Sequence, residues 1–149
     1  VLGRADALPF PDASFAAVFC ECFLSLCDDP GHALGEVRRV LALGGRLALS
    51  DMYLRDPGAG PPSPELPAGS CLRAALSLDE TRTLIESAGF EVTLCEDRSE
   101  TLKTLMASLI FSYGSAAGFW EDATGGGEVD AAWLRAARPG YLILAARML

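Results

Sequence analysis

Short apolar runs alternate with helical patterns along this 149-residue chain, and that alternation restricts its fold more than any other feature. The run at residues 16–23 is typical of a strand buried on both faces of a parallel sheet. A helical pattern follows at residues 30–41, and Arg46–Ser50 forms the next short run. Strands separated by helices predict an α/β sheet. The length fits a single domain over residues 1–149.

The first helix has a clear start and a clear stop. Asp29 is placed to cap its N-terminus, with Pro30 at the first helical position. The pair Gly44-Gly45 is expected to end it, because glycine accepts the left-handed conformation of a C-terminal turn. Arg46–Ser50 then forms a strand, with Asp51 at its carboxyl end.

The rear of the chain predicts three more helices and two more strands. A proline- and glycine-rich loop at residues 56–70 precedes them, and Gly125–Gly127 is a flexible break. Ser77 and Glu80 form a capping box. The expected elements are a helix from Ser77 to Ala88, a strand at Phe90–Cys95, a helix from Ser99 to Gly114, a helix at Val129–Ala137 anchored by Trp133, and a strand at Tyr141–Ala146. The helical stripe expected in the core is Leu102, Leu105, Met106, Leu109, Ile110 and Tyr113.

Composition excludes several classes of protein. A net charge of −8 argues against a nucleic-acid partner, because phosphate binding needs a basic face. The apolar stretches are too short to span a membrane, and no secretory signal is visible, so we expect a cytoplasmic protein. Five cysteines, an odd number, do not indicate a disulfide framework.

Two sequence blocks carry a family resemblance. Leu8-Pro9-Phe10-Pro11-Asp12-Ala13-Ser14-Phe15 is followed about thirty residues later by Arg39-Val40-Leu41-Ala42-Leu43-Gly44-Gly45-Arg46. Together they resemble the middle of a class I S-adenosylmethionine-dependent methyltransferase of the type 11 family. The resemblance implies a partial Rossmann-like sheet with flanking helices, lacking the N-terminal cofactor-binding strands. It also implies that Phe90–Cys95 and Tyr141–Arg147 pair antiparallel.

The resemblance places a cofactor site in the first residues of the chain. The family packs its Leu-Pro-Phe loop against the adenine, which implies S-adenosylmethionine contacts for Asp6, Ala7, Leu8 and Phe10. The acidic residue that the family carries four positions before this block is Arg4 here, so Asp6 is the substitute if the loop is shifted in register. Phe10 is nearly as consistent with a core aromatic under the loop.

Strand ends supply the remaining candidates. Glu21 lies at the carboxyl end of the first strand, where open α/β sheets place their ligands, although a solvated carboxylate explains it equally well. Asp51 and Tyr53 are candidates for a substrate pocket, with an ordinary strand-end turn as the alternative. Cys71 lies in a Gly-x-Cys-Leu-x-x-Ala-Leu segment that is similar to the arsenic-binding segment of arsenite methyltransferases, which makes it a candidate substrate ligand.

No metal site is predicted. Cys20, Cys22 and Cys27 do not have the spacing of a zinc knuckle, and buried cysteines that act as small hydrophobic residues explain them better. Cys20 and Cys22 are two residues apart on the expected strand, so they share a face. His32, the only histidine, is expected at the surface near a helix start.

Two classes of function follow. The first is an enzyme: a truncated form, or the C-terminal portion, of a methyltransferase acting on a small molecule, with the remaining half lost or supplied by another polypeptide. The second is a non-catalytic module that binds a protein partner, or a second copy, through the open sheet edge. A nicotinamide-dependent oxidoreductase is weaker, because the chain has no Gly-x-Gly-x-x-Gly after a strand and no Tyr-x-x-x-Lys pair.

Overall fold

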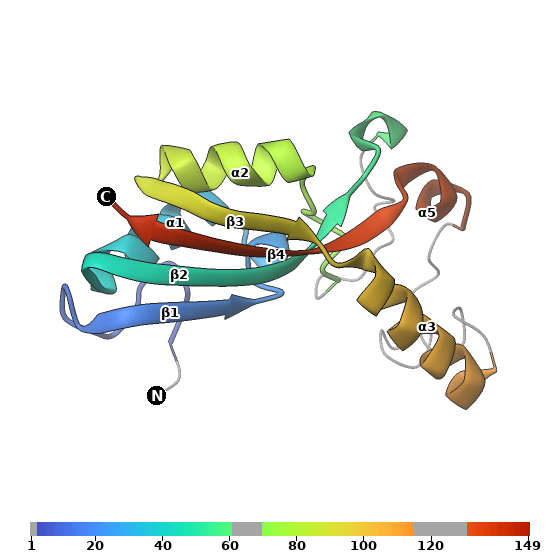
Figure 1. Cartoon of the computed structure of the whole chain (residues 1–149), viewed down its shortest axis with the longest axis horizontal. Coiled ribbons are helices and arrows are strands. Elements are labelled where there is room, and N and C mark those ends of the chain that lie inside the picture. The colour runs from blue at the N-terminus through green and yellow to red at the C-terminus, as the bar shows by residue number, and fades with distance from the viewer. Residues whose placement is uncertain (1–2, 61–69, 115–130) are drawn as a thin grey trace.

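A four-stranded mixed sheet organises the molecule (Figure 1). The computed structural model describes residues 3–60, 70–114 and 131–149. The strands are β1 (Phe15–Glu21), β2 (Leu41–Leu54), β3 (Phe90–Asp97) and β4 (Pro139–Met148), in the spatial order β1-β2-β4-β3. β1 and β2 are parallel, whereas β4 runs antiparallel to both of its neighbours, β2 and β3. The α/β class and the antiparallel rear pair are therefore confirmed.

Three of the helices, α1, α2 and α3, begin where the sequence predicts. They are η1 (Leu24–Leu26), α1 (Pro30–Val40), η2 (Pro57–Ala59), α2 (Leu78–Ser87), α3 (Ser99–Tyr113) and α5 (Ala131–Ala137). The carboxylate of Asp29 accepts a hydrogen bond from the His32 backbone at 2.9 Å, and Ser77 and Glu80 form the capping box of α2. Gly89 and Gly114 follow α2 and α3 with φ of +88° and +78°, which other residues adopt only with strain.

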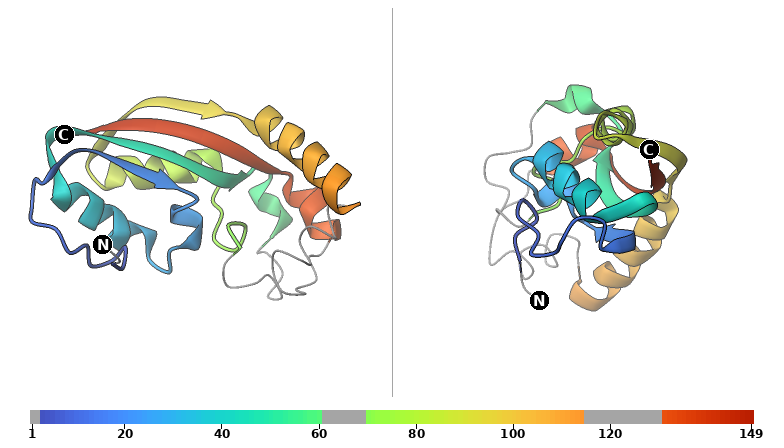
Figure 2. Two further views of the ribbon diagram at one scale, coloured as in Figure 1. Left: turned by 90° about the horizontal axis from the view of Figure 1, so that it is seen from below. Right: turned by 90° about the vertical axis from the view of Figure 1, so that its left-hand side faces the viewer.

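One face of the sheet carries the hydrophobic core. α1 and α2 both lie against that face (Figure 2). The α1 side chains Leu34 and Val37 and the α2 side chain Ile85 pack with alternate residues of the strands. The strand and loop residues that share this core are Cys20, Leu24, Leu41, Leu47, Leu49, Tyr53, Phe90, Leu142, Leu144 and Ala146. A second cluster at the α5 end contains Leu54, Leu72, Trp133 and Ala137, so Trp133 anchors α5 as predicted.

The opposite face is uncovered by any helix of the described residues. An apolar row crosses all four strands on it, because Phe19 pairs with Ala48, Ala48 with Ala145, and Ala145 with Leu94. Phe19 is 78% exposed and Leu94 is 41% exposed. β1 pairs only with β2, so its other edge is open in the described part of the chain.

The Gly44-Gly45 prediction is wrong in detail. α1 ends at Val40, and Leu41 is already extended, with φ −76° and ψ 138°. Both glycines lie inside β2, where Gly44 has φ +71° and a Cβ on Gly45 would lie 2.6 Å from the Ala42 carbonyl oxygen. β2 also continues through Asp51, which pairs with Leu142, so Asp51 is not at a strand end. Leu41 is buried in the core as the first residue of β2, so the strand begins before the two glycines and not after them.

α3 contradicts the core expectation for its stripe. It projects away from the sheet (Figure 1). Of the stripe, Leu105 and Ile110 are exposed and Leu102 and Leu109 are half-buried, and the neighbouring Phe111 is 94% exposed. The stretch at residues 61–69 of the predicted loop, the Gly125–Gly127 break and residues 129–130 of the predicted helix lie outside the described residues. Within the described residues, no helix combines the length and the apolar character needed to cross a bilayer.

Candidate functional site

The segment before β1 forms a turn that lies beside the first residues of α1. The Ala7 backbone N–H donates to the Arg4 carbonyl at 3.2 Å, and the Arg4 guanidinium pairs with the Asp6 carboxylate at 2.7 Å. This hydrogen bond lowers the pKa of Asp6, so its carboxylate is ionised at neutral pH. Arg4, Ala5 and Asp6 line a cavity of about 310 Å³. The remaining lining residues come from the chain after β1: Leu26, Cys27, Asp28, Asp29, His32 and Ala33.

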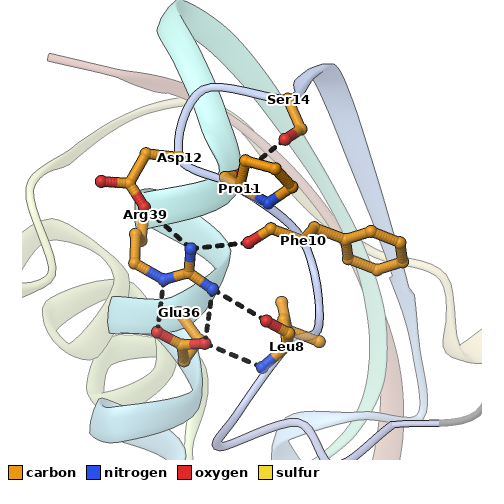
Figure 3. Close-up of polar contacts among 7 residues, drawn as sticks. All are labelled: Leu8, Phe10, Pro11, Asp12, Ser14, Glu36 and Arg39. Carbon is orange, nitrogen blue, oxygen red and sulfur yellow. Dashed lines mark hydrogen bonds and ion pairs between the residues drawn. The ribbon is translucent and has the colours of Figure 1, made fainter.

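The next residues of the loop are held against α1 (Figure 3). The Leu8 backbone N–H donates to the Glu36 carboxylate at 2.8 Å, and the Leu8 carbonyl accepts from Arg39 at 2.9 Å. Arg39 also donates to the Phe10 carbonyl at 2.8 Å. Hydrogen bonds from Arg39 and from Leu8 lower the pKa of Glu36 to about 2. The loop is therefore fixed by an ionised carboxylate–guanidinium pair.

The Phe10 ring points away from that pair and contacts β1. Its centroid lies 5.0 Å from that of Phe15, with the two rings perpendicular. Figure 3 shows the Phe10 carbonyl directed at Arg39 and the ring on the other side of the backbone. Both rings are partly exposed, so Phe10 is neither a core residue nor a lining residue of the 310 Å³ cavity.

The last residue of β1, Glu21, and the residue after it, Cys22, differ in backbone conformation. Glu21 ends the strand and is exposed on the uncovered face, outside the lining of the 310 Å³ cavity. Cys22 follows with φ +44°, and its backbone N–H donates to the Ser50 carbonyl at 2.8 Å. Because β1 ends at Glu21, the prediction that places Cys22 on the same strand as Cys20 is wrong, although both thiols lie near Asp51. A non-glycine residue at positive φ carries local strain.

Asp51 is a buried carboxylate, 2% exposed. It accepts hydrogen bonds from the Ser25 backbone N–H at 3.1 Å, from the Ser25 hydroxyl, and from the Met52 backbone N–H at 2.8 Å. The adjoining cavity has only about 10 Å³, about enough for one water. In this arrangement Asp51 ties η1 to β2.

Tyr53 is also buried, and its ring packs against the backbone of Gly140. Hydrogen bonding from Ser99, and more weakly from Tyr53, lowers the pKa of Asp97. Arg55 pairs with the same carboxylate at 3.3 Å. The Tyr53 hydroxyl therefore belongs to a polar cluster at the junction of β2, β3 and α3.

The thiols gather near Asp51. Burial is the main cause that raises the pKa of Cys20 to about 12 and that of Cys22 to about 11. After burial, the largest cause that raises the pKa of Cys22 is the negative charge that the Cys71 thiolate would carry. The two side chains are therefore neighbours. The Cys27 thiol donates to the Phe23 carbonyl at 3.2 Å. Cys20 is buried, as expected of a small hydrophobic residue.

The structure places the predicted residues in different surroundings. Asp6 reaches a cavity, Ala7, Leu8 and Phe10 lie in the adjoining loop, and Cys71 meets Cys22. Asp51 and Tyr53 are buried and interact with other residues inside the fold, and Glu21 lies on the uncovered face of the sheet. Glu36, Arg39 and His32 were not among the predicted site residues. The Glu-x-x-Arg spacing on one helix face was the signal that could have indicated the first two. Among the described residues, no group of three or more His, Cys, Asp or Glu side chains could hold a metal ion.

Comparison with known proteins now gives these features a family. The profile described as "Methyltransferase domain" matches residues 1–49, which hold the loop, β1 and the start of β2. The chain is similar to the class I S-adenosylmethionine-dependent methyltransferases. It is similar to the 27-O-demethylrifamycin SV methyltransferase of Amycolatopsis mediterranei (strain S699), with 39% identity over 105 residues. That match covers 67% of this chain and 39% of the relative.

Two further matches define the breadth of the family. An arsenite methyltransferase of Halobacterium salinarum is 28% identical over 103 residues, covering 67% of this chain and 26% of the relative. The crystal structure of the [4+2]-cyclase SpnF matches with a TM-score of 0.66 and 28% identity, over 99% of this chain and 54% of that chain. This chain spans 39% of the length of the 27-O-demethylrifamycin SV methyltransferase and 26% of the length of the arsenite methyltransferase.

Proposed function

We propose that this chain is the C-terminal portion of an S-adenosylmethionine-dependent methyltransferase that acts on a small molecule. The observation that carries the proposal is the loop at residues 4–10, which is bonded to Glu36 and Arg39 of α1 and lies beside the 310 Å³ cavity. This cavity lies after the carboxyl end of β1, and open α/β sheets bind their ligands at such ends. Similarity to this family supports the reaction class, since the 39% identical relative is named as a methyltransferase.

The residues of the cavity fit a nucleoside better than an anion. Asp6, Asp28 and Asp29 supply carboxylate acceptors for amino and hydroxyl groups. Arg4 occupies the position of the family's acidic residue, and the turn at Ala7 brings the Asp6 carboxylate to the same cavity. Bound S-adenosylmethionine would supply an activated methyl group for in-line displacement. This chain's own contribution would be positioning and exclusion of water.

Calorimetric titration with S-adenosylhomocysteine tests the proposal. We expect micromolar binding that is weakened at least fivefold by Asp6→Ala. Asp56→Ala is the matched control, because Asp56 caps η2 outside the cavity lining. No detectable binding to the wild-type chain would contradict the proposal. A measured affinity is needed because the same fold also occurs in a cyclase, so fold alone does not establish methyl transfer.

The neighbouring thiols favour a second candidate, a trivalent arsenical as methyl acceptor. Cys22 and Cys71 are neighbours although they lie far apart in the sequence, and Cys22 has φ +44°. Soft thiolate ligands suit such acceptors. The arsenite methyltransferase relative supports this candidate, although no third thiol of the described residues completes a cluster.

Phenylarsine oxide separates the two acceptor classes, because it forms two S–As bonds with a thiol pair and releases water. An arsenical site predicts one equivalent bound, with at least tenfold weaker binding in Cys22→Ser and in Cys71→Ser. Cys95→Ser on β3 is the control, since Cys95 lies apart from this pair. Equal binding by all three variants would remove the arsenical candidate and leave a general small-molecule acceptor.

The uncovered face supports the remaining alternative, a non-catalytic module that binds a partner. Parallel sheets are normally covered on both faces, and here the face with Phe19 and Leu94 is open in the described residues. A homodimer or a partner chain would cover it. This alternative predicts association without any S-adenosylhomocysteine binding, so the same titration separates it from the enzyme.

A further inference from the structure

Arg39 uses every hydrogen-bond donor of its guanidinium (Figure 3). Nε donates to Glu36 Oε1 at 2.7 Å, and one Nη2 hydrogen goes to Glu36 Oε2 at 2.9 Å. The other Nη2 hydrogen goes to the Leu8 carbonyl at 2.9 Å. Nη1 donates to the Phe10 carbonyl and to Asp12 Oδ1, both at 2.8 Å. A guanidinium has five N–H donors, and all five have acceptors here.

The backbone adds two more ties between the loop and α1. Glu36 Oε2 accepts from the Leu8 N–H at 2.8 Å, so Glu36 binds both the loop and Arg39. The Ala13 N–H donates to the Arg39 carbonyl at 2.9 Å, and Ala13 has φ +55°. The segment from Leu8 to Ala13 is therefore held at its beginning, middle and end by one turn of α1. We call this set of bonds the Arg39 clamp.

The clamp determines which way the loop presents its side chains. The carbonyls of Leu8 and Phe10 turn inward to Arg39, which leaves the Phe10 ring on the other side of the backbone, against Phe15. The side chains of Arg39 and Glu36 are 32% and 16% exposed, so they are partly shielded from water. Lysine cannot reproduce this arrangement, because an ammonium group has three donors and no planar fork.

We propose that Arg39 and Glu36 are positioning residues that set the conformation of the nucleoside-facing loop and so control cofactor affinity from outside the cavity. The inference rests on the proposed function, and it adds residues that do not line the cavity themselves. A helix-borne pair at i and i+3 thereby preorganises a loop that would otherwise lose conformational freedom on binding.

Amide hydrogen exchange and cofactor titration test the clamp together. The variants are Arg39→Lys, Glu36→Gln and the milder Asp12→Asn, which weakens only one of the five guanidinium bonds. Arg82→Lys is the matched control, because Arg82 makes an ion pair with Glu86 on α2 at 2.9 Å, away from the loop. Circular dichroism verifies that each variant is folded.

In Arg39→Lys and Glu36→Gln we expect the Leu8 and Ala13 amides to exchange at least tenfold faster than in the wild type, with S-adenosylhomocysteine binding at least fivefold weaker. Asp12→Asn should show a smaller change in the same direction, and Arg82→Lys none. Unchanged exchange, or faster exchange with unchanged affinity, would overturn the positioning role. A wild-type chain that fails to bind S-adenosylhomocysteine would instead overturn the proposed function, and the positioning role with it.

Discussion

Gly140 shows how closely backbone and side chains approach at the residue scale. A Cβ at this position would lie 2.5 Å from Tyr53 Cε1 and 2.6 Å from Ser99 Oγ. Both neighbours are buried, so neither can move without disturbing other contacts. The choice of glycine here follows from the tyrosine that packs on it, since its φ is not in the left-handed region.

Gly140→Ala should therefore lower the free energy of unfolding by about 1–3 kcal/mol, the usual cost of overpacking a core. Urea denaturation measures it. Gly35→Ala is the matched control, because Gly35 lies on α1 with no atom within 4 Å of the added methyl. That substitution should instead stabilise the chain by about 1 kcal/mol. A Gly140→Ala variant as stable as the wild type would show that the Tyr53 ring can shift.

At the scale of single elements, the capping box of α2 is the clearest case of local sequence chemistry. The Ser77 hydroxyl accepts from the Glu80 N–H at 3.2 Å, and the Glu80 carboxylate accepts from the Ser77 N–H at 2.8 Å. Two backbone donors that the first turn leaves free are thereby satisfied. The Glu80 carboxylate also accepts from the Ser77 hydroxyl at 2.6 Å, and this bond together with the one from the Ser77 N–H lowers the pKa of Glu80.

Ser77→Ala should cost about 1 kcal/mol of stability, because it removes the acceptor for the Glu80 N–H. Thermal or urea unfolding measures the change. Thr83→Ala on the exposed side of the same helix is the control and should be neutral or slightly stabilising. If the two variants lose equal stability, the box does not determine where α2 begins.

Local signals predicted the start of α1 and both ends of α2, whereas the end of α1 depended on packing. Asp29, Ser77 and Gly89 act within one turn of chain, and all three were placed correctly. The Gly44-Gly45 turn was misplaced because burial of Leu41 against the core decides where α1 gives way to β2. The exposure of α3 could not be predicted, since an apolar stripe does not specify what covers it.

The candidate site followed the same division. The loop at residues 4–10 was predicted from the family resemblance, whereas the strand-end position predicted for Asp51 was wrong. Its hydrogen bonds to Ser25 come from a segment 26 residues away and are invisible to local patterns. The Arg39 clamp was missed because two of the five acceptors of Arg39 are backbone carbonyls, which every residue carries, and a third, the Asp12 carboxylate, lies 27 residues away in the sequence.

For the whole molecule, lowered carboxylate pKa values make stability depend on pH. The groups concerned are Asp6, Glu36, Glu80 and Asp97, held by Arg4, Arg39, Ser77 and Ser99 respectively. Each pKa is lower in the folded chain, so the unfolded chain binds more protons in acid. The contribution of these carboxylates to the free energy of unfolding is fully present above about pH 4.5. It is lost as the pH falls toward the Glu36 pKa of about 2.

The free energy of unfolding should therefore fall steadily between pH 4.5 and pH 2, as measured by urea titrations at several pH values. Glu36→Gln removes the most strongly shifted of these groups and should make the fall shallower. Identical slopes for the variant and the wild type would mean that the Glu36–Arg39 pair forms equally in the unfolded chain.

The uncovered sheet face gives the last whole-molecule prediction. The row formed by Phe19, Ala48, Ala145 and Leu94 exposes apolar surface across every strand, which a chain in water covers by association or leaves as a dye-binding patch. Phe19→Ser with Leu94→Ser should reduce binding of an apolar fluorescent dye by more than half and shift sedimentation toward the monomer. Phe111→Ser is the control, because Phe111 is equally apolar and 94% exposed but lies on α3, off the sheet. If only the control loses dye binding, the dye binds to α3 and not to the sheet face. The prediction that the sheet face is covered by association would then be wrong.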